Sequence, residues 1–551
     1  MKSHVHARAG RRLRGLPLAA ATLFAAPLAG GTAEAAEPAT TPTQPETDAP
    51  FRLSVGFDSW TEYASPFELG GGTEPGNNHY DPDVTLSARL RAGFDTRLGT
   101  PKLHLVGEGD FFAQRFVGAP TDVGTYRVDP ELRRGEVFHP FPLGLRKLYL
   151  EWRPSFGMLR VGQQTSNWGL GIVAQGGDRD GRLFGDTFRG NSSERVLFAT
   201  SPLQAFGAAP QSVLGRLTLV LAGDLVYADE TAELLDHQFD VADKAYQVVG
   251  SLLVRPQEWT TPATTARWDL NGGLYGARRS QTYAEGDQLD VWVLDGAVQF
   301  KGDLSAQTDL RFGAEAAYIT GNTDRIHTEN GPRGVDVRAY GAAVEAEAGS
   351  VLGGLPMRLT LLSGLASGDA DPDDGQSNRF TFHGDYDVGL ILFDQVIPAL
   401  QRRSTERVDN PLHAKDTPKG YEAFAGRGGL SGADYALLRA AVGPTHGVTF
   451  GVQAMGAATT GPALDPFTTF TAGGSPRNAF GGAGEGTFGT ELAAALRIAL
   501  PRLAHDLEPS LRATYAVLLP GEVLEGPRGR LGDVHYIQLK LSFDGVRGGG
   551  R

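Results

Sequence analysis

The chain has 551 residues, a formal net charge of −13 and no cysteine. The absence of cysteine excludes disulfides, thiolate metal sites, a cysteine nucleophile and a lipoprotein anchor, and the acidic balance argues against a nucleic-acid-binding protein. Hydrophobic residues make up only 41% of the chain, and beyond the N-terminus no apolar run is long enough for a membrane-spanning helix. A β-barrel is compatible with this composition, because each of its strands is apolar on one face only.

Residues 1–35 have the features of a secretory signal peptide. Basic residues cluster within positions 2–14, an apolar stretch follows over 16–28, and Ala33-Glu34-Ala35 is a cleavage motif of the small-residue type. A single N-terminal membrane anchor is the alternative, and the shortness of the apolar stretch disfavours it. Residues 36–50 are rich in proline and threonine, which predicts a flexible periplasmic linker.

From Phe51 onward, apolar and polar residues alternate with a period of two. In one segment, Val84, Leu86 and Leu90 alternate with Arg89 and Arg91. The same pattern recurs at 51–58, 147–153, 309–318, 491–500, 510–517 and 535–543. Segments with one apolar and one polar face are typical of tilted strands that cross a bilayer.

The predicted connections alternate between short and long. Short ones fall at 98–101, 154–157, 301–305, 444–447 and 501–506, and long ones at 61–82, 115–143, 166–192, 227–243, 321–334, 367–433, 458–487 and 520–532. Outer-membrane barrels have short periplasmic turns and long extracellular loops. We therefore predict an all-β fold over 51–543, a single transmembrane antiparallel β-barrel of about 18 strands, with 16 and 20 as the alternatives. A flexible C-terminal tail is expected over 544–551.

Several stretches resemble a known family of outer-membrane proteins. They lie at 145–152, 159–169, 366–374, 488–492 and 519–521. Together they resemble the alginate-export-like family of outer-membrane porins. The resemblance implies a large barrel with an arginine-lined lumen that passes an anionic polysaccharide. The lumen charges predicted for this chain are mixed instead of strongly basic, which argues against alginate itself.

The polar face of each strand should point into the barrel. By alternation, the basic residues predicted to face the lumen and a solute are Arg89, Arg91, Lys147, Arg153, Arg160, Arg267, Arg311, Arg358, Arg439, Arg497 and Arg512, with Lys540 on the same face of the last strand. Carboxylates such as Glu108, Asp110, Glu151 and Glu315 share this face. One interpretation is selectivity for anionic solutes, and the other is that opposite charges pair across strands and stiffen the wall. A one-residue bulge would move part of this set to the other face.

An acidic loop is the candidate metal site. Asp369, Asp371, Asp373 and Asp374 lie within six residues, and oxygen ligands of this kind suit calcium. Their spacing differs from that of an EF-hand, so the prediction is a calcium site of another kind in the loop at 369–374. The alternative is a solvated acidic loop. No other cofactor is expected.

Residues 384–400 are apolar although they lie in the longest predicted loop. So apolar a segment should not be exposed to water. We weigh three interpretations: the segment folds inward as a constriction or plug, it forms an additional strand, or it makes an oligomer contact.

These features predict a porin in the outer membrane of a Gram-negative bacterium, giving passive passage to small or anionic solutes, anionic saccharides included. The expected partners are outer-membrane lipid, the barrel-assembly machinery and the solute, with no nucleic acid; the oligomeric state is not predicted. The alternatives are an anchor or adhesin with a plugged lumen and, third, a barrel hydrolase. Neither Gly-x-Ser-x-Gly nor His-Glu-x-x-His occurs in the chain, so we predict that it is not an enzyme.

Overall fold

The chain divides into two units, Met1–Ala35 and Ala36–Arg551. The computed structural model describes residues 50–70, 79–80, 84–117, 143–178, 182–186, 190–210, 212–229, 231–232, 234, 242–260, 267–284, 286–305, 307–327, 333–372, 374–408, 429–445, 447–502 and 507–549, all in the second unit. The predicted signal peptide and all but the last residue of the predicted linker lie outside these residues.

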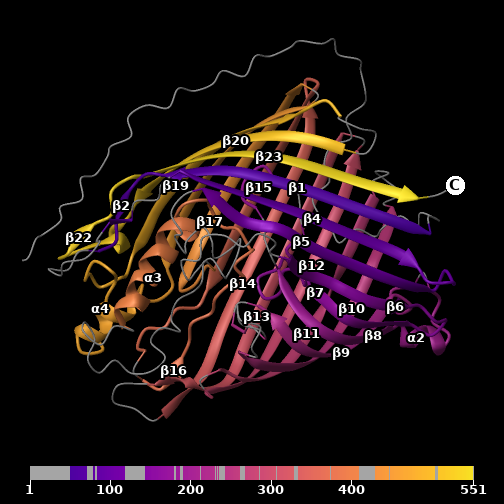
Figure 1. Cartoon of the computed structure of the whole chain (residues 1–551), viewed down its shortest axis with the longest axis horizontal. Coiled ribbons are helices and arrows are strands. Elements are labelled where there is room, and N and C mark those ends of the chain that lie inside the picture. The colour runs from indigo at the N-terminus through magenta and orange to yellow at the C-terminus, as the bar shows by residue number, and fades with distance from the viewer. Residues whose placement is uncertain are drawn as a thin grey trace, which may run out of the picture. The chain divides into compact units, whose positions relative to one another are not determined.

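Within the described residues, 18 long strands form a closed antiparallel ring, as predicted (Figure 1). In ring order they are β1 (Phe51–Ala64), β4 (Thr85–Arg97), β5 (Leu103–Val117), β6 (Leu143–Trp152), β7 (Met158–Ser166), β8 (Asn191–Thr200), β9 (Leu217–Ala228), β10 (Lys244–Thr260), β11 (Arg267–Thr282), β12 (Gln288–Ser305), β13 (Thr308–His327), β14 (Arg333–Leu352), β15 (Leu355–Ala366), β17 (Ala433–Thr445), β18 (Val448–Thr459), β19 (Thr487–Ala499), β20 (Leu507–Pro520) and β23 (Val534–Gly549).

Short elements occupy the connections. They are β2 (Phe67–Glu68), β3 (His79–Tyr80), α2 (Pro202–Ala205), β16 (Gln376–Ser377), the π-helix η2 (Leu392–Val396), α3 (Ile397–Val408), α4 (Pro466–Thr471), the 3-10 helix η4 (Glu522–Leu524), β21 (Glu525–Gly526) and β22 (Gly529–Arg530). Among the described helices, none is long and apolar enough to cross a membrane.

The ring closes between the first and last strands. β1 pairs with β23 from Phe51↔Gly549 to Ala64↔Tyr536, and with β4 on its other side. The rings of Phe57 and Phe543 lie 5.9 Å apart across the closing seam. Closure satisfies the backbone hydrogen bonds of both edge strands, which a barrel needs in lipid.

The outer face of the ring is apolar and exposed. Leu148 and Leu150 on β6 are 44% and 45% exposed, and Leu274 on β11 is 65% exposed. Their neighbours of opposite parity point inward and carry most of the charge. A closed barrel with an apolar exterior and a charged interior is the structure of an outer-membrane protein, because lipid then contacts only apolar side chains.

Some predicted boundaries are wrong, and the short connection expected at 301–305 is one of them, because β12 continues to Ser305. The predicted flexible tail begins inside a strand, because β23 continues to Gly549 and its residues beyond Phe543 pair with 51–56 of β1. The predicted long connection at 321–334 is also wrong, since β13 runs to His327 and β14 starts at Arg333. At the tail and at 321–334, paired backbone extends a strand through residues whose polar side chains suggest a loop. At the opposite end, Gly353 and Gly354 form a two-residue hairpin loop with φ values of +60° and +82°, which glycine adopts without strain.

Candidate functional site: the barrel interior

Among the described residues, parts of two connections are bound to the inward face of the barrel wall. The first inner segment, described over 167–178 and 182–186, joins β7 to β8. The second inner segment, residues 380–408, lies in the connection from β15 to β17. Each is recognised as interior because side chains on the inward face of the wall, such as Gln299 and Glu491, hydrogen-bond its backbone.

The second inner segment contains the apolar stretch 384–400. Phe380, Phe382, Ile391 and Leu392 are buried, in one cluster with wall residues that include Leu437. The interpretation that this stretch folds inward is therefore confirmed. The additional-strand interpretation is wrong, because 392–408 is helical, forming η2 and α3. The physical reason for the inward fold is burial, because the apolar side chains of this stretch leave water by packing against the wall.

Two glutamates of the wall hold the inner segments by their backbones. Glu491 on β19 accepts hydrogen bonds from the backbone N–H groups of Leu390, Ile391 and Leu392, at 2.6, 2.9 and 3.1 Å. Glu315 on β13 accepts from the N–H groups of 170, 171 and 172 of the first inner segment. A carboxylate that accepts successive N–H groups satisfies donors that would otherwise be buried without partners.

The two inner segments also bind each other. Asp387 Oδ2 accepts from the backbone N–H of Asp186 at 2.7 Å, and the backbone N–H of His383 donates to the carbonyl of Ile172 at 2.9 Å. Next to these contacts, Asp385 Oδ2 accepts from the N–H of Gly190 at 2.7 Å. The segments therefore form one connected layer across part of the interior.

Three of the predicted lumen residues bind the first inner segment through hydrogen bonds and ion pairs. Arg91 binds Asp110 through two bonds of 2.6 and 2.8 Å and donates to the carbonyl of Gly177 at 2.6 Å. Lys147 Nζ lies 2.8 Å from Asp178. Arg512 donates to the carbonyls of Arg182 and Gly185 and binds Asp186 Oδ2 at 2.6 Å.

Two wall cations converge on Asp186 of the first inner segment. Lys540 Nζ lies 2.5 Å from its Oδ1, and Arg512 binds its other oxygen. Burial alone would raise the pKa of Asp186, but Arg512 and Lys540 lower it below its ordinary value. Asp186 is therefore ionised at neutral pH, as an anchor between two cations requires.

Arg146 is an inward-facing cation that the alternation missed. A bulge in the β5–β6 ladder at Glu108/Gly109 leaves Arg146 without an opposing residue, so both Arg146 and Lys147 point inward. Arg146 is 2% exposed and binds Glu108 and the carbonyl of Gly176. Two adjacent cations, Arg146-Lys147, in an otherwise alternating strand are the sequence signal that could have indicated the bulge.

Four other predicted residues bind carboxylates of the wall. Arg153 and Arg160 share Glu151, and their side chains are 52% and 32% exposed. Arg311 and Arg358 lie against Glu347, which also accepts from Thr360. The Arg358 side chain is 32% exposed. These guanidinium groups belong to the part of the wall whose cations do not bind the inner segments.

The remaining predicted residues lie at separate places. Arg89 binds Asp58 at 2.9 Å in a buried pair. Arg439 donates to Gln453 at 2.7 Å and lies over the ring of Phe184. Arg267 is exposed at the start of β11, and Arg497 is half-buried opposite Arg512. The predicted set thus forms several small clusters and not one continuous row.

The predicted calcium ligands do not converge in the described part of the loop. Asp369 accepts backbone N–H groups of Asp371 and Asn378, and Asp374 accepts that of Gln376. Among the described residues, no group of three acidic or histidine side chains is placed to hold a metal ion. Asp373 lies outside the described residues, so the calcium site stays a prediction.

Comparison with known proteins gives similarity to solved structures only. No family model matches the chain, and no curated protein matches its sequence. Among solved structures, Acinetobacter baumannii OccAB1 is 11% identical, with 91% of this chain and 99% of that chain covered and a TM-score of 0.46. The outer membrane protein OprD from Pseudomonas aeruginosa is 11% identical, with 91% and 94% covered and a TM-score of 0.45. Pseudomonas aeruginosa OpdK with vanillate is 9% identical, with 90% and 99% covered and a TM-score of 0.44. The resemblance to the alginate-export-like family stays a prediction.

Proposed function

We propose that the protein is an outer-membrane channel through which small anionic solutes pass passively. The observation that carries the proposal is the group Arg153, Glu151 and Arg160 at the β6–β7 hairpin, where two partly exposed guanidinium groups share one carboxylate. Within this group the cations outnumber the carboxylate by one, which favours an anionic solute. Charges that line a narrow aqueous path bias which solutes enter it.

The two inner segments support a constriction in this proposal. They are bound to the wall and to each other, so they narrow the interior at a fixed place. A solute would pass the half-exposed cations before or after this constriction. Anionic saccharides belong to the proposed solute class, and outer-membrane lipid and the barrel-assembly machinery are the proposed partners.

Planar-bilayer recording tests the proposal. Purified protein should give stable channels, and the reversal potential in a KCl gradient should indicate a preference for chloride. The double variant R153Q/R160Q should lose most of this preference while its channels remain. R278Q is the matched control, because Arg278 lies on the outer face and binds Asp290 there. An unchanged reversal potential in R153Q/R160Q would contradict the role of these arginines. A liposome-swelling series with neutral and anionic sugars then defines the solute.

The competing proposal is an anchor or adhesin whose lumen is closed. The apolar cluster around 380–400 favours it, because buried apolar side chains fill part of the interior. If no channel forms in bilayers, either with the intact chain or after removal of 384–400, the closed-barrel function replaces the channel. The hydrolase alternative predicts release of fatty acid from phospholipid, and we expect none.

A further inference from the structure

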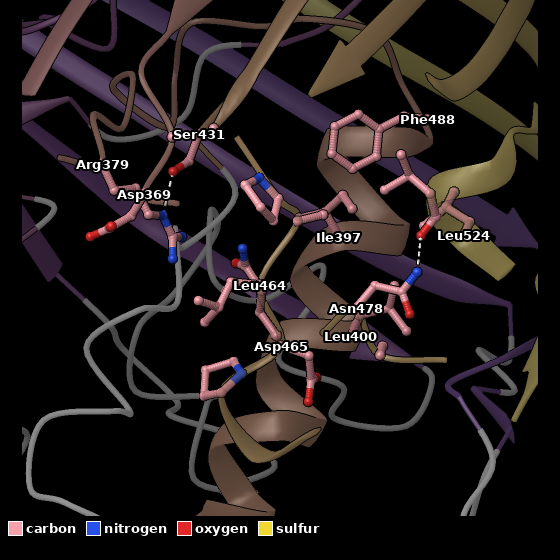
Figure 2. A pocket seen from close by; sticks show the side chains of 18 of the residues that line it. Asp369, Arg379, Ile397, Leu400, Ser431, Leu464, Asp465, Asn478, Phe488 and Leu524 are labelled. Carbon is pink, nitrogen blue, oxygen red and sulfur yellow. Dashed lines mark hydrogen bonds between the residues drawn. The ribbon is translucent and has the colours of Figure 1, made fainter. Parts of the chain in front are cut away.

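A cavity of about 80 Å³ lies among the long connections, apart from the cation clusters of the wall. We call it the loop pocket. Figure 2 shows its sides: α3 contributes Ile397 and Leu400, the connection from β18 to β19 contributes Leu464, and Leu524 comes from η4. Phe488 of β19 closes it on another side. Most of the surface that a ligand would contact here is apolar.

One cation enters this apolar pocket. Arg379 donates from Nε to Ser431 Oγ at 2.5 Å (Figure 2). Within the described part of the chain, its two terminal nitrogens have no hydrogen-bond partner and no ion-pair partner. Burial lowers the pKa of Arg379 and the nearby Asp369 carboxylate raises it, which leaves a pKa of about 10, so the guanidinium stays charged at neutral pH. A half-buried cation whose terminal N–H groups have no protein acceptor can donate them to a ligand in the pocket.

Neighbouring polar side chains of the lining already make hydrogen bonds within the protein. Asn478 donates to the carbonyls of Val523 and Glu525 and accepts from two backbone N–H groups. Asp465 caps α4 by accepting from the N–H of Thr468 at 2.7 Å. Asp369 accepts two backbone N–H groups at 3.2 and 3.3 Å. Among these lining groups, Arg379 is therefore the one with hydrogen-bond donors left for a ligand, and its charge also interacts with that of Asp369.

The chemistry of the lining limits the ligand. A planar guanidinium with two free nitrogens matches a carboxylate, which can accept two parallel hydrogen bonds. The aliphatic side chains around it suit a hydrocarbon chain. A saccharide fits poorly, because its many hydroxyl groups would be buried without partners. The cavity is small, so the chain must be short.

We propose that the loop pocket binds a short-chain aliphatic carboxylate, with the carboxylate on the terminal nitrogens of Arg379 and the chain against Leu400, Leu464 and Phe488. This site is lined by none of the wall cations invoked for the solute above, and it does not rest on the channel function. Its ligand class also differs, since the wall cations suit hydrophilic anions.

Calorimetry on the full-length protein in phosphatidylcholine nanodiscs tests the proposal, with empty nanodiscs as reference. Butyrate, hexanoate and octanoate should bind saturably, and affinity should rise about fourfold for each added methylene until the chain no longer fits. Hexanol, which has the chain without the charge, should bind at least about tenfold more weakly. R379Q should weaken hexanoate binding by about tenfold or more. R530Q is the matched control, because Arg530 is exposed in a neighbouring connection outside the lining, and it should change nothing.

A second variant tests the contribution of the apolar lining to ligand binding, separately from any effect on folding. L464W should fill the pocket and abolish hexanoate binding while Arg379 remains. Heat-modifiable mobility on gels reports whether each variant still forms the barrel. The proposal is overturned if folded R379Q binds hexanoate as tightly as R530Q, or if hexanoate and hexanol bind equally. It is also overturned if the intact protein shows no saturable binding of hexanoate. Channel recordings on the same preparation test the proposed channel function separately.

Discussion

At the scale of single residues, the interior is dominated by cations matched to carboxylates. Arg195 binds Asp224 through two bonds of 2.7 Å, and Arg279 binds Asp229 in the same manner. Charges removed from water are tolerated when they are paired and hydrogen-bonded, and removing one partner leaves the other uncompensated. The interpretation that opposite charges pair across strands is therefore correct for much of the wall. The partly exposed arginines near Glu151 are the ones on which the interpretation of anion selectivity depends.

Replacing Arg512 with glutamine should release the first inner segment locally. The change removes the charge from a side chain that binds two carbonyls and Asp186, and we expect a loss of about 3 kcal/mol in local stability. Hydrogen exchange of the amides at 182–186 should accelerate accordingly. R278Q, on the outer face, should leave these amides unchanged. Equal protection in R512Q and the intact protein would mean that the other contacts of the segment suffice.

Acid should release the same segment only at low pH. Because burial is outweighed by Arg512 and Lys540, the folded-state pKa of Asp186 is lower than its ordinary value of 3.8. The contribution of this carboxylate to stability is therefore fully present above about pH 4 and is lost as the pH falls through the lowered pKa. Exchange at 182–186, corrected for intrinsic rates, should stay slow from pH 7 to 4 and accelerate below. Acceleration between pH 7 and 5 would contradict this role of Asp186.

The alternation placed most interior cations correctly but could not place Arg146. A bulge shifts the facing of residues on one strand only, and it depends on how the neighbouring strand pairs. Likewise, the partner of Arg512 comes from a connection far away in sequence, so no local pattern links it to Asp186. The alternation of apolar and polar residues predicts which side chains point inward. It does not predict which carboxylate or carbonyl each inward cation binds.

At the scale of elements, the strands and the inner segments differ in which interactions determine their conformation. A strand of this barrel is predictable from local alternation, because one of its faces contacts lipid along its whole length and the other faces the interior. The second inner segment depends instead on Glu491, which is 101 residues away from Leu390 in sequence. Its apolar composition predicted that it would leave water, and only the tertiary contacts decide that it does so as a helix.

Replacing Glu491 with glutamine should loosen the second inner segment. Glutamine keeps one acceptor oxygen but introduces two donors facing the N–H groups of 390–392, and charge-assisted bonds are worth about 1.5–3 kcal/mol each. We expect a loss of about 2 kcal/mol or more in the stability of this segment. Limited proteolysis should then cleave within 384–408, and channel conductance should rise or fluctuate. E525Q, at an exposed glutamate, is the control, and a protease-resistant E491Q would show that apolar packing alone retains the segment.

At the scale of the whole molecule, closure depends on one seam. The interior layer, the charged wall and the apolar exterior all require that β1 and β23 stay paired, since an open edge in lipid leaves backbone groups without partners. The sequence predicted this closure from the alternation at both ends. It did not predict the length of the seam, because the polar and glycine residues after Phe543 carry no alternation, and their pairing depends on the partner strand.

Truncation tests whether the extended seam matters. Removing 544–551 deletes the partners of Phe51, Leu53 and their neighbours through Gly56, while Phe543 and its contact with Phe57 remain. Residues 51–56 then keep β4 as their single neighbour, so the folded barrel loses ladder hydrogen bonds on one side. The temperature at which the barrel loses its heat-modifiable gel mobility should fall by several degrees. A truncation that removes only 550–551 leaves the seam intact and should melt like the full chain. Equal melting of both truncated forms would mean that the barrel is closed by the pairs between 57 and 64 alone, with the end of β23 contributing nothing to its stability.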